Sequence, residues 1–138
     1  MSKILNEIID YLNKNQLDKA YELCELINDK KLDHIILNIK GVIFLKNNKI
    51  NEAKKNFLKS SDIDKEFIDP HKNLFQLYMK TKDLKSAIEK GKKIIDLELN
   101  KNPLSYFNLA YAYDLNKDLK KAVKLYKITE SLNFKRSE

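Results

Sequence analysis

The chain has 138 residues, which is enough for one domain with its own apolar core. Its net charge is +7, but 26 of its 27 basic residues are lysine, whereas recognition of phosphates and bases favours arginine, so the charge indicates a solvated surface. A single cysteine excludes an internal disulfide framework and favours a reducing, cytoplasmic location.

The first segment, residues 1–33, starts with apolar residues three and four apart, interrupted by Glu7 and Asp10. This spacing predicts an amphipathic helix rather than the apolar core of a signal peptide. A polar turn and a second helix follow in "LNKNQLDKAYELC" at 12–24. No run of residues in the sequence is apolar enough to predict a membrane span.

The same turn-and-helix phrase returns at 45–57, 79–91 and 114–126. Each copy carries an alanine, at intervals of 33, 34 and 35 residues: Ala20, Ala53, Ala87 and Ala122. An aromatic residue precedes each alanine by nine positions: Tyr11, Phe44, Tyr78 and Tyr113. This period predicts helical hairpins, in which a large residue on the first helix faces a small one on the second. We therefore expect the four alanines to be buried.

Capping signals predict where several helices begin. Asn102 before Pro103, and Asp69 before Pro70, each combine a capping side chain with a proline suited to the first helical position. Asp33 is expected to cap a helix that begins at His34. The last helix is expected to cover about residues 119–132.

Repeats of this kind resemble the tetratricopeptide repeat family. The fourth segment matches its signature best, through Tyr106, Leu109, Ala110, Tyr113, Ala122 and Tyr126. The other segments depart from it at Glu7, Ile8, Lys40 and Phe75. The resemblance implies an all-α fold, a right-handed α-solenoid of four antiparallel helix-turn-helix hairpins. It implies a single domain over 1–138, with repeats at about 1–33, 34–67, 68–102 and 103–134 and a short tail at 135–138.

Residues that could carry catalysis are isolated from one another. His34 and His71 lie near the starts of different helices, and Cys24 occupies a slot that holds an aromatic residue in two other repeats. Gly41 and Gly91 stand alone inside helices, which excludes a glycine-rich phosphate loop and indicates close helix contacts. We therefore expect no enzyme activity, no metal, no cofactor and no small-molecule substrate.

The resemblance implies a concave groove, lined by the first helix of each hairpin, that binds a protein or peptide segment. The candidate groove residues are Val42, Leu45, Lys72, Asn73, Gln76, Lys80, Phe107, Asn108 and Tyr111. Their mixture of lysines, amides and aromatic rings favours an acidic-hydrophobic partner. Lys72 and Asn108 match positions with which some family members hold a terminal carboxylate, but Leu5 and Ile9 in the first repeat argue against that mode. Phe107 and Tyr111 could instead pack against the adjacent repeat.

Other functions stay open at this point. The chain could be the N-terminal array of a larger enzyme, such as a glycosyl- or sulfo-transferase. The lysines of the second helices could bind an anionic surface or nucleic acid, although a solvated face is the favoured interpretation. Because no polar capping helix follows the last repeat, we also expect either self-association through this end or a longer native chain.

Overall fold

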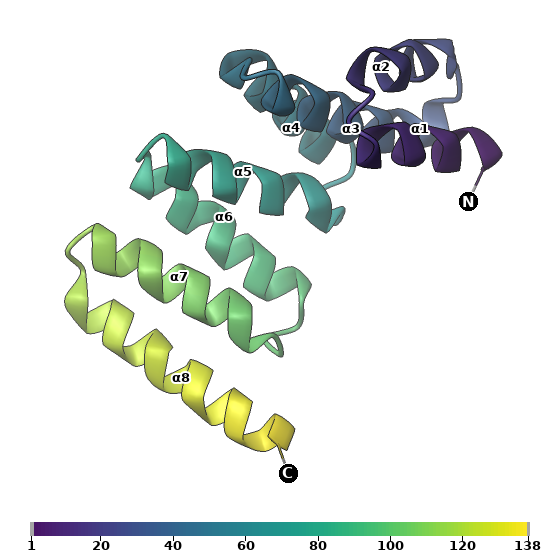
Figure 1. Ribbon diagram of the computed structural model, residues 1–138. Helices are drawn as coiled ribbons and strands as arrows, with labels where there is room; N and C mark the ends of the chain where they lie inside the picture. Colours follow the sequence, from purple (N-terminus) through teal and green to yellow (C-terminus); the bar gives the residue numbers. More distant parts are fainter. Residues whose placement is uncertain (1, 138) are drawn as a thin grey trace. The chain divides into compact units, whose positions relative to one another are not determined.

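The structure is a computed structural model that describes residues 2–137. Within that range it consists of eight α-helices and one short 3-10 helix, without strands, so the predicted all-α repeat fold is confirmed (Figure 1). The elements are α1 (Lys3–Asn13), α2 (Leu17–Leu26), η1 (Lys30–Leu32), α3 (Asp33–Lys46), α4 (Ile50–Ile63), α5 (Ile68–Lys80), α6 (Leu84–Leu97), α7 (Pro103–Leu115) and α8 (Leu119–Ser137).

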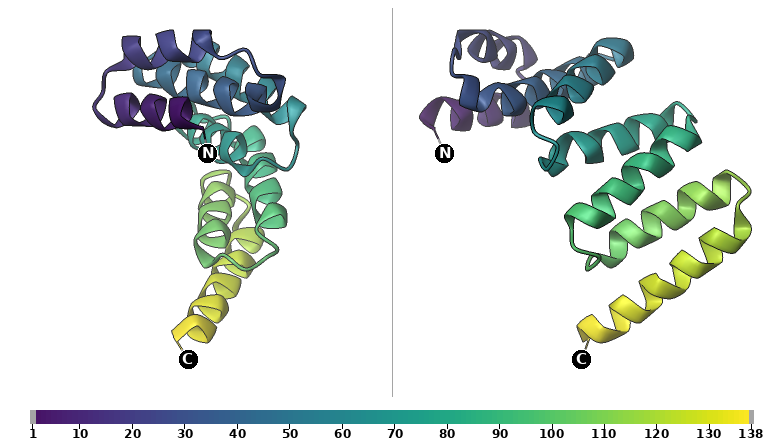
Figure 2. Two further views of the ribbon diagram at one scale, coloured as in Figure 1. Left: turned by 90° about the vertical axis from the view of Figure 1, so that its right-hand side faces the viewer. Right: turned by 180° about the vertical axis from the view of Figure 1, so that it is seen from behind.

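The chain divides into two compact units, Met1–Pro70 and His71–Glu138. The expectation of a single domain stays a prediction. Within the first unit α1 packs on α2 and α3 on α4, and within the second α7 packs on both α6 and α8. The two helices of each of these pairs run antiparallel (Figures 1 and 2).

Each unit buries apolar side chains from several of its helices. In the first unit one core cluster comprises Leu5, Ile8, Ala20, Cys24, Ile36, Ile39 and Ile43. In the second unit α6, α7 and α8 contribute Ala87, Ile88, Ile94, Ile95, Leu109, Ala110, Ala112, Tyr113 and Ala122. The four alanines of the repeated slot are at most 2% exposed, as the sequence predicts.

The four polar turns share one backbone geometry. In each turn the residue five positions before the alanine has a positive φ: Asn15, Asn48, Lys82 and Lys117. The next residue donates its N–H to the carbonyl of the aromatic slot, as in Gln16 to Tyr11 at 2.8 Å and Asp118 to Tyr113 at 2.9 Å. A left-handed residue with these bonds forms the Schellman motif, which satisfies the last carbonyls of the first helix. The turn therefore has the same physical basis in every repeat.

A small residue faces a large one where the two helices of a hairpin cross. A Cβ atom added to Gly41 on α3 would lie 2.5 Å from the ring of Phe57 on α4. In the third repeat the order is reversed, because a Cβ on Gly91 would lie 3.4 Å from the ring of Phe75 on α5. Phe75 thus departs from the family pattern without overfilling the hairpin.

Two predicted helix starts are wrong by one or two residues, and one is confirmed. Helix α7 begins at Pro103, with the Asn102 side chain accepting a hydrogen bond from the Leu104 N–H at 3.1 Å. Helix α5, however, begins at Ile68, so Asp69 lies inside its first turn and is not the cap. A carboxylate at this position stabilises the helix by interacting with the positive end of the helix dipole.

Helix α3 begins at Asp33 itself, because the 3-10 turn η1 leads directly into it. Helix α8 continues to Ser137, past its expected end at 132, in a stretch that contains neither glycine nor proline.

Replacing each glycine by alanine tests how rigid the neighbouring side chains are. Gly41→Ala should lower stability by about 1–2 kcal/mol, because the new methyl meets a fully buried ring that cannot move away. Gly91→Ala should change stability by less than about 1 kcal/mol, because its nearest contact, at 2.9 Å, is the flexible end of Leu109 and alanine favours the helix. Urea denaturation of both variants measures the difference, and equal losses would contradict the packing described.

Relieving a left-handed backbone should have the opposite effect. Lys117→Gly should raise stability by about 0.5–1 kcal/mol, because lysine at φ 68° carries a steric cost that glycine lacks. Lys127→Gly, an equally exposed lysine inside α8, is the matched control and should lower stability by about 1 kcal/mol. Two variants that both lose stability would show that the turn at Lys117 is not strained.

Candidate functional site

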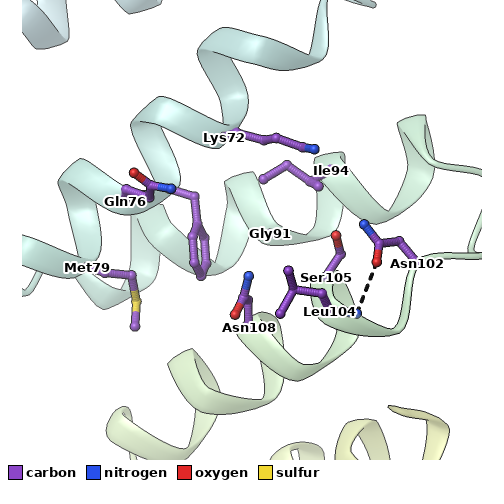
Figure 3. A pocket seen from close by; sticks show the side chains of 10 residues that line it. Lys72, Gln76, Met79, Gly91, Ile94, Asn102, Leu104, Ser105 and Asn108 are labelled. Carbon is purple, nitrogen blue, oxygen red and sulfur yellow. Dashed lines mark hydrogen bonds between the residues drawn. The ribbon is translucent and has the colours of Figure 1, made fainter. Parts of the chain in front are cut away.

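A cavity of about 540 Å³ lies in the second unit, between α5, α6 and the first turns of α7. Lys72, Gln76 and Met79 reach it from α5, and Asn108 reaches it from α7 (Figure 3). The complete lining is Lys72, Phe75, Gln76, Met79, Gly91, Ile94, Asn102, Leu104, Ser105 and Asn108. The apolar part of this lining can bury aliphatic or aromatic groups, and the amides can pair with polar groups of a ligand.

The carboxylate of Glu98, directly after α6, is held beside this cavity by three donors. The Ser105 hydroxyl donates a hydrogen bond to Oε1, and the Asn102 amide donates to Oε2 at 2.9 Å. The Lys72 ammonium lies 3.4 Å from the same Oε2. Glu98 therefore connects α5 to the start of α7 and places a negative charge beside Lys72.

The pKa of Glu98 responds to two opposing effects. Burial alone raises it, since the side chain is only 16% exposed. The hydrogen bonds from Ser105 and Asn102 and the ammonium of Lys72 stabilise the charged form by more, so the pKa lies below its ordinary value of 4.5. The carboxylate is therefore ionised at neutral pH.

The predicted groove residues fall into distinct groups. Lys72, Gln76 and Asn108 line the cavity together. Val42 and Leu45 are half-buried on α3 and belong to the first unit, and Asn73 and Lys80 lie on α5 outside the lining. The part of these four residues in binding stays a prediction.

The two predicted aromatic residues of α7 lie outside the cavity lining. Phe107 is 46% exposed, and its ring packs on Tyr126 of its own repeat, with centroids 5.6 Å apart. Tyr111, one turn later, is 48% exposed. Much of both rings is therefore accessible to a ligand.

Several cavity residues were missed because the repeat template does not assign them to the groove. Asn102 was expected only as a helix cap, and Ser105 and Leu104 carried no signal of their own. Gly91 was expected to mark a close helix contact, and it does, but its missing side chain also leaves space beside Ile94 in the cavity.

Cys24, the single cysteine, is buried in the core of the first unit. Burial raises the pKa of the Cys24 thiol to about 11, which suits a core residue rather than a nucleophile.

Lys40, where the second repeat departs from the family pattern, lies 3.4 Å from a carboxylate oxygen of Glu25 and 5.4 Å from the ring centre of Tyr21. These contacts stabilise a lysine whose side chain is only 19% exposed.

The two histidines belong to different units. His34 packs edge-on against Phe67 at 5.0 Å and lies 3.8 Å from Asp64. His71 is buried, at 5% exposure. Among residues 2–137, no three His, Cys, Asp or Glu side chains gather in a way that could hold a metal ion. None of the helices described is long and apolar enough to cross a bilayer.

Comparison with known proteins identifies the class of the fold. The sequence model of the tetratricopeptide repeat matches residues 35–67 and 104–127. The chain is therefore a helical repeat protein, and these two segments are tetratricopeptide repeats. No curated protein matches the sequence.

Solved structures of MamA share the fold. One crystal structure of MamA superposes with a TM-score of 0.84 at 18% identity, covering 97% of this chain and 78% of that chain. Another gives 0.83 at 17% identity, with 97% and 73% covered. MamA from Desulfovibrio magneticus RS-1 gives 0.79 at 17% identity, with 94% and 73% covered. The repeats and this fold support a protein-interaction scaffold in general.

The surroundings of Glu98 predict a dependence of stability on pH. Because its pKa is lowered in the folded state, its contribution is present above pH 4.5 and is lost as the pH falls below that value. Glu98→Gln should lower the Tm at pH 7 by a few degrees, and the difference from the original protein should narrow towards pH 3.

Glu89→Gln, an exposed substitution on α6, is the matched control and should leave the pH profile unchanged. Thermal unfolding followed by circular dichroism between pH 7 and 3 measures both variants. A difference that stays constant over this range would show that the ionised carboxylate adds no stability.

Proposed function

We propose that this chain is a non-catalytic scaffold that binds a segment of a partner protein along the first helices of its hairpins. The observation that carries the proposal is the cavity of about 540 Å³, where Lys72, Gln76 and Asn108 meet above an apolar floor. The binding surface extends over the exposed rings of Phe107 and Tyr111. The tetratricopeptide repeats at 35–67 and 104–127 support a binding role.

The cavity suits an apolar side chain flanked by backbone amides. Its volume is within the range of about 300–1,000 Å³ that is typical of ligand pockets. Phe75, Met79 and Ile94 offer apolar surface, while Gln76 and Asn108 can each donate to and accept from a peptide backbone. The partner segment would therefore insert an aliphatic or aromatic anchor here.

The arrangement of charges refines the expected partner. Lys72 already lies 3.4 Å from Glu98, so an acidic ligand group would share this lysine with a protein carboxylate. Lys80 is exposed on α5, about two turns after Lys72, and can attract acidic residues at the rim of the cavity. The anchor should thus supply most of the affinity, and acidic residues should mainly orient the segment.

Binding by this surface can be tested in two stages. A photo-crosslinking amino acid at position 76 should capture a partner that the same group at position 85, on the exposed side of α6, does not capture. With the captured segment as a synthetic peptide, Gln76→Ala together with Asn108→Ala should weaken binding at least about tenfold. Lys85→Ala with Lys120→Ala, on helices α6 and α8, should change it by less than about threefold.

Two outcomes would contradict the proposal. One is capture only from position 85. The other is a loss of affinity in the Lys85 and Lys120 variant that equals the loss in the cavity variant.

A further inference from the structure

A second groove of about 540 Å³ opens on another side of the same helices, between α6, α7 and α8. Neighbouring residues divide between the two cavities: Ile94 lines the first and Ile95 the second. On α7, Asn108 lines the first and Leu109 the second. Helices α6 and α7 therefore form a wall between two separate surfaces. We call this surface the α8 groove, lined by Lys92, Ile95, Asp96, Tyr106, Leu109, Tyr113, Lys121, Lys124, Leu125 and Ile128.

The α8 groove combines an apolar floor with a positive rim. Tyr106, Leu125 and Ile128 are half-buried, so part of each apolar side chain can still be covered by a ligand. Three exposed lysines, Lys92, Lys121 and Lys124, stand against one carboxylate, Asp96. An apolar strip between cationic residues is complementary to a helix with an apolar face and acidic flanks.

The composition of the groove disfavours other occupants. A second copy of this chain would bring a net charge of +7 to a surface that is itself positive. Single-stranded nucleic acid needs accessible rings for base stacking, but Tyr113 is only 6% exposed and its ring has the ammonium of Lys121 5.5 Å from its centre. Tyr106 is half-buried, and the rest of the floor is aliphatic, which offers bases little and apolar side chains much.

We propose that the α8 groove is a second docking surface, which binds an acidic amphipathic helix of a partner protein. The helix lays apolar residues spaced i, i+3, i+4 and i+7 over Tyr106, Leu125 and Ile128, and its acidic residues face the three lysines. This surface is separate from the cavity of the proposed function and does not depend on it. A chain with both surfaces joins two partners.

A designed probe tests this surface directly. The probe is a fluorescein-labelled helical peptide of about five turns with leucine on one face and glutamate on the other, and its binding is measured by anisotropy at physiological salt. A peptide of the same composition in scrambled order is its control. The ordered peptide should bind at least about tenfold more tightly, because only it presents a continuous apolar face.

Charge reversal locates the contact. The variant with Lys92→Glu, Lys121→Glu and Lys124→Glu should weaken binding at least about tenfold. The matched variant with Lys85→Glu, Lys120→Glu and Lys127→Glu changes three exposed lysines of the same two helices outside the groove and should weaken it by less than about threefold. Circular dichroism confirms that both variants stay folded.

Methyl NMR distinguishes the two cavities. The ordered peptide should shift the methyl signals of Ile95 and Ile128 more than those of Ile94, which lines the other cavity. The proposal is overturned by any of four results: no binding of the ordered peptide, equal binding of the scrambled one, equal losses in the two triple variants, or shifts confined to Ile94. Tighter binding of single-stranded RNA, lost in the groove variant alone, would assign the surface to nucleic acid instead.

Discussion

The close crossing of two helices in each hairpin is the constraint on which the rest of this structure depends. Because Gly41 has no side chain, the ring of Phe57 on α4 packs directly against the backbone of α3. A Cβ atom at Gly41 would lie only 2.5 Å from that ring. Protein interiors are packed too densely to hold two large residues at such a point. Two crossings pair one large residue with one small residue, on either helix: Gly41 with Phe57, and Phe75 with Gly91.

The turns maintain this crossing through the backbone rather than through side chains. The residue that donates to the aromatic slot is Gln16, Lys49, Asp83 or Asp118, and its N–H makes the same bond in every case. Because any residue except proline has this N–H, the side chain at that position is free to vary. The geometry of the array can therefore persist while its surface changes, which suits a protein whose surface is its means of binding.

The sequence predicts the regular part of the fold well and the junctions between repeats poorly. Ala20, Ala53, Ala87 and Ala122 are buried as expected, because their period follows directly from the hairpin. The start of α3 was displaced because Leu32 leads into that helix without the side-chain cap that the sequence suggested. Helix α5 begins one residue before Asp69, its expected cap. Propensity rules place a helix more reliably than they place its first residue.

The candidate site is predictable only where it follows the repeat. Lys72, Gln76 and Asn108 were expected because the family template assigns them positions, and these three residues line one cavity. Glu98 was not predicted, since it lies in the connection between α6 and α7, where the repeat template assigns no periodic position. Its role arises from Lys72, Asn102 and Ser105, which are near it only after folding. The α8 groove was missed for a similar reason, because its lysines are indistinguishable from solvated ones until Leu125 and Ile128 lie beside them.

The wall between the two cavities has a thermodynamic consequence. Ile94 and Ile95 are consecutive residues of one helix, so a displacement of α6 by a ligand on one side moves the lining of the other side as well. Two occupants that favour the same position of α6 strengthen each other's binding, and two that favour different positions weaken it. This coupling energy is reciprocal, so each partner changes the affinity for the other by the same factor.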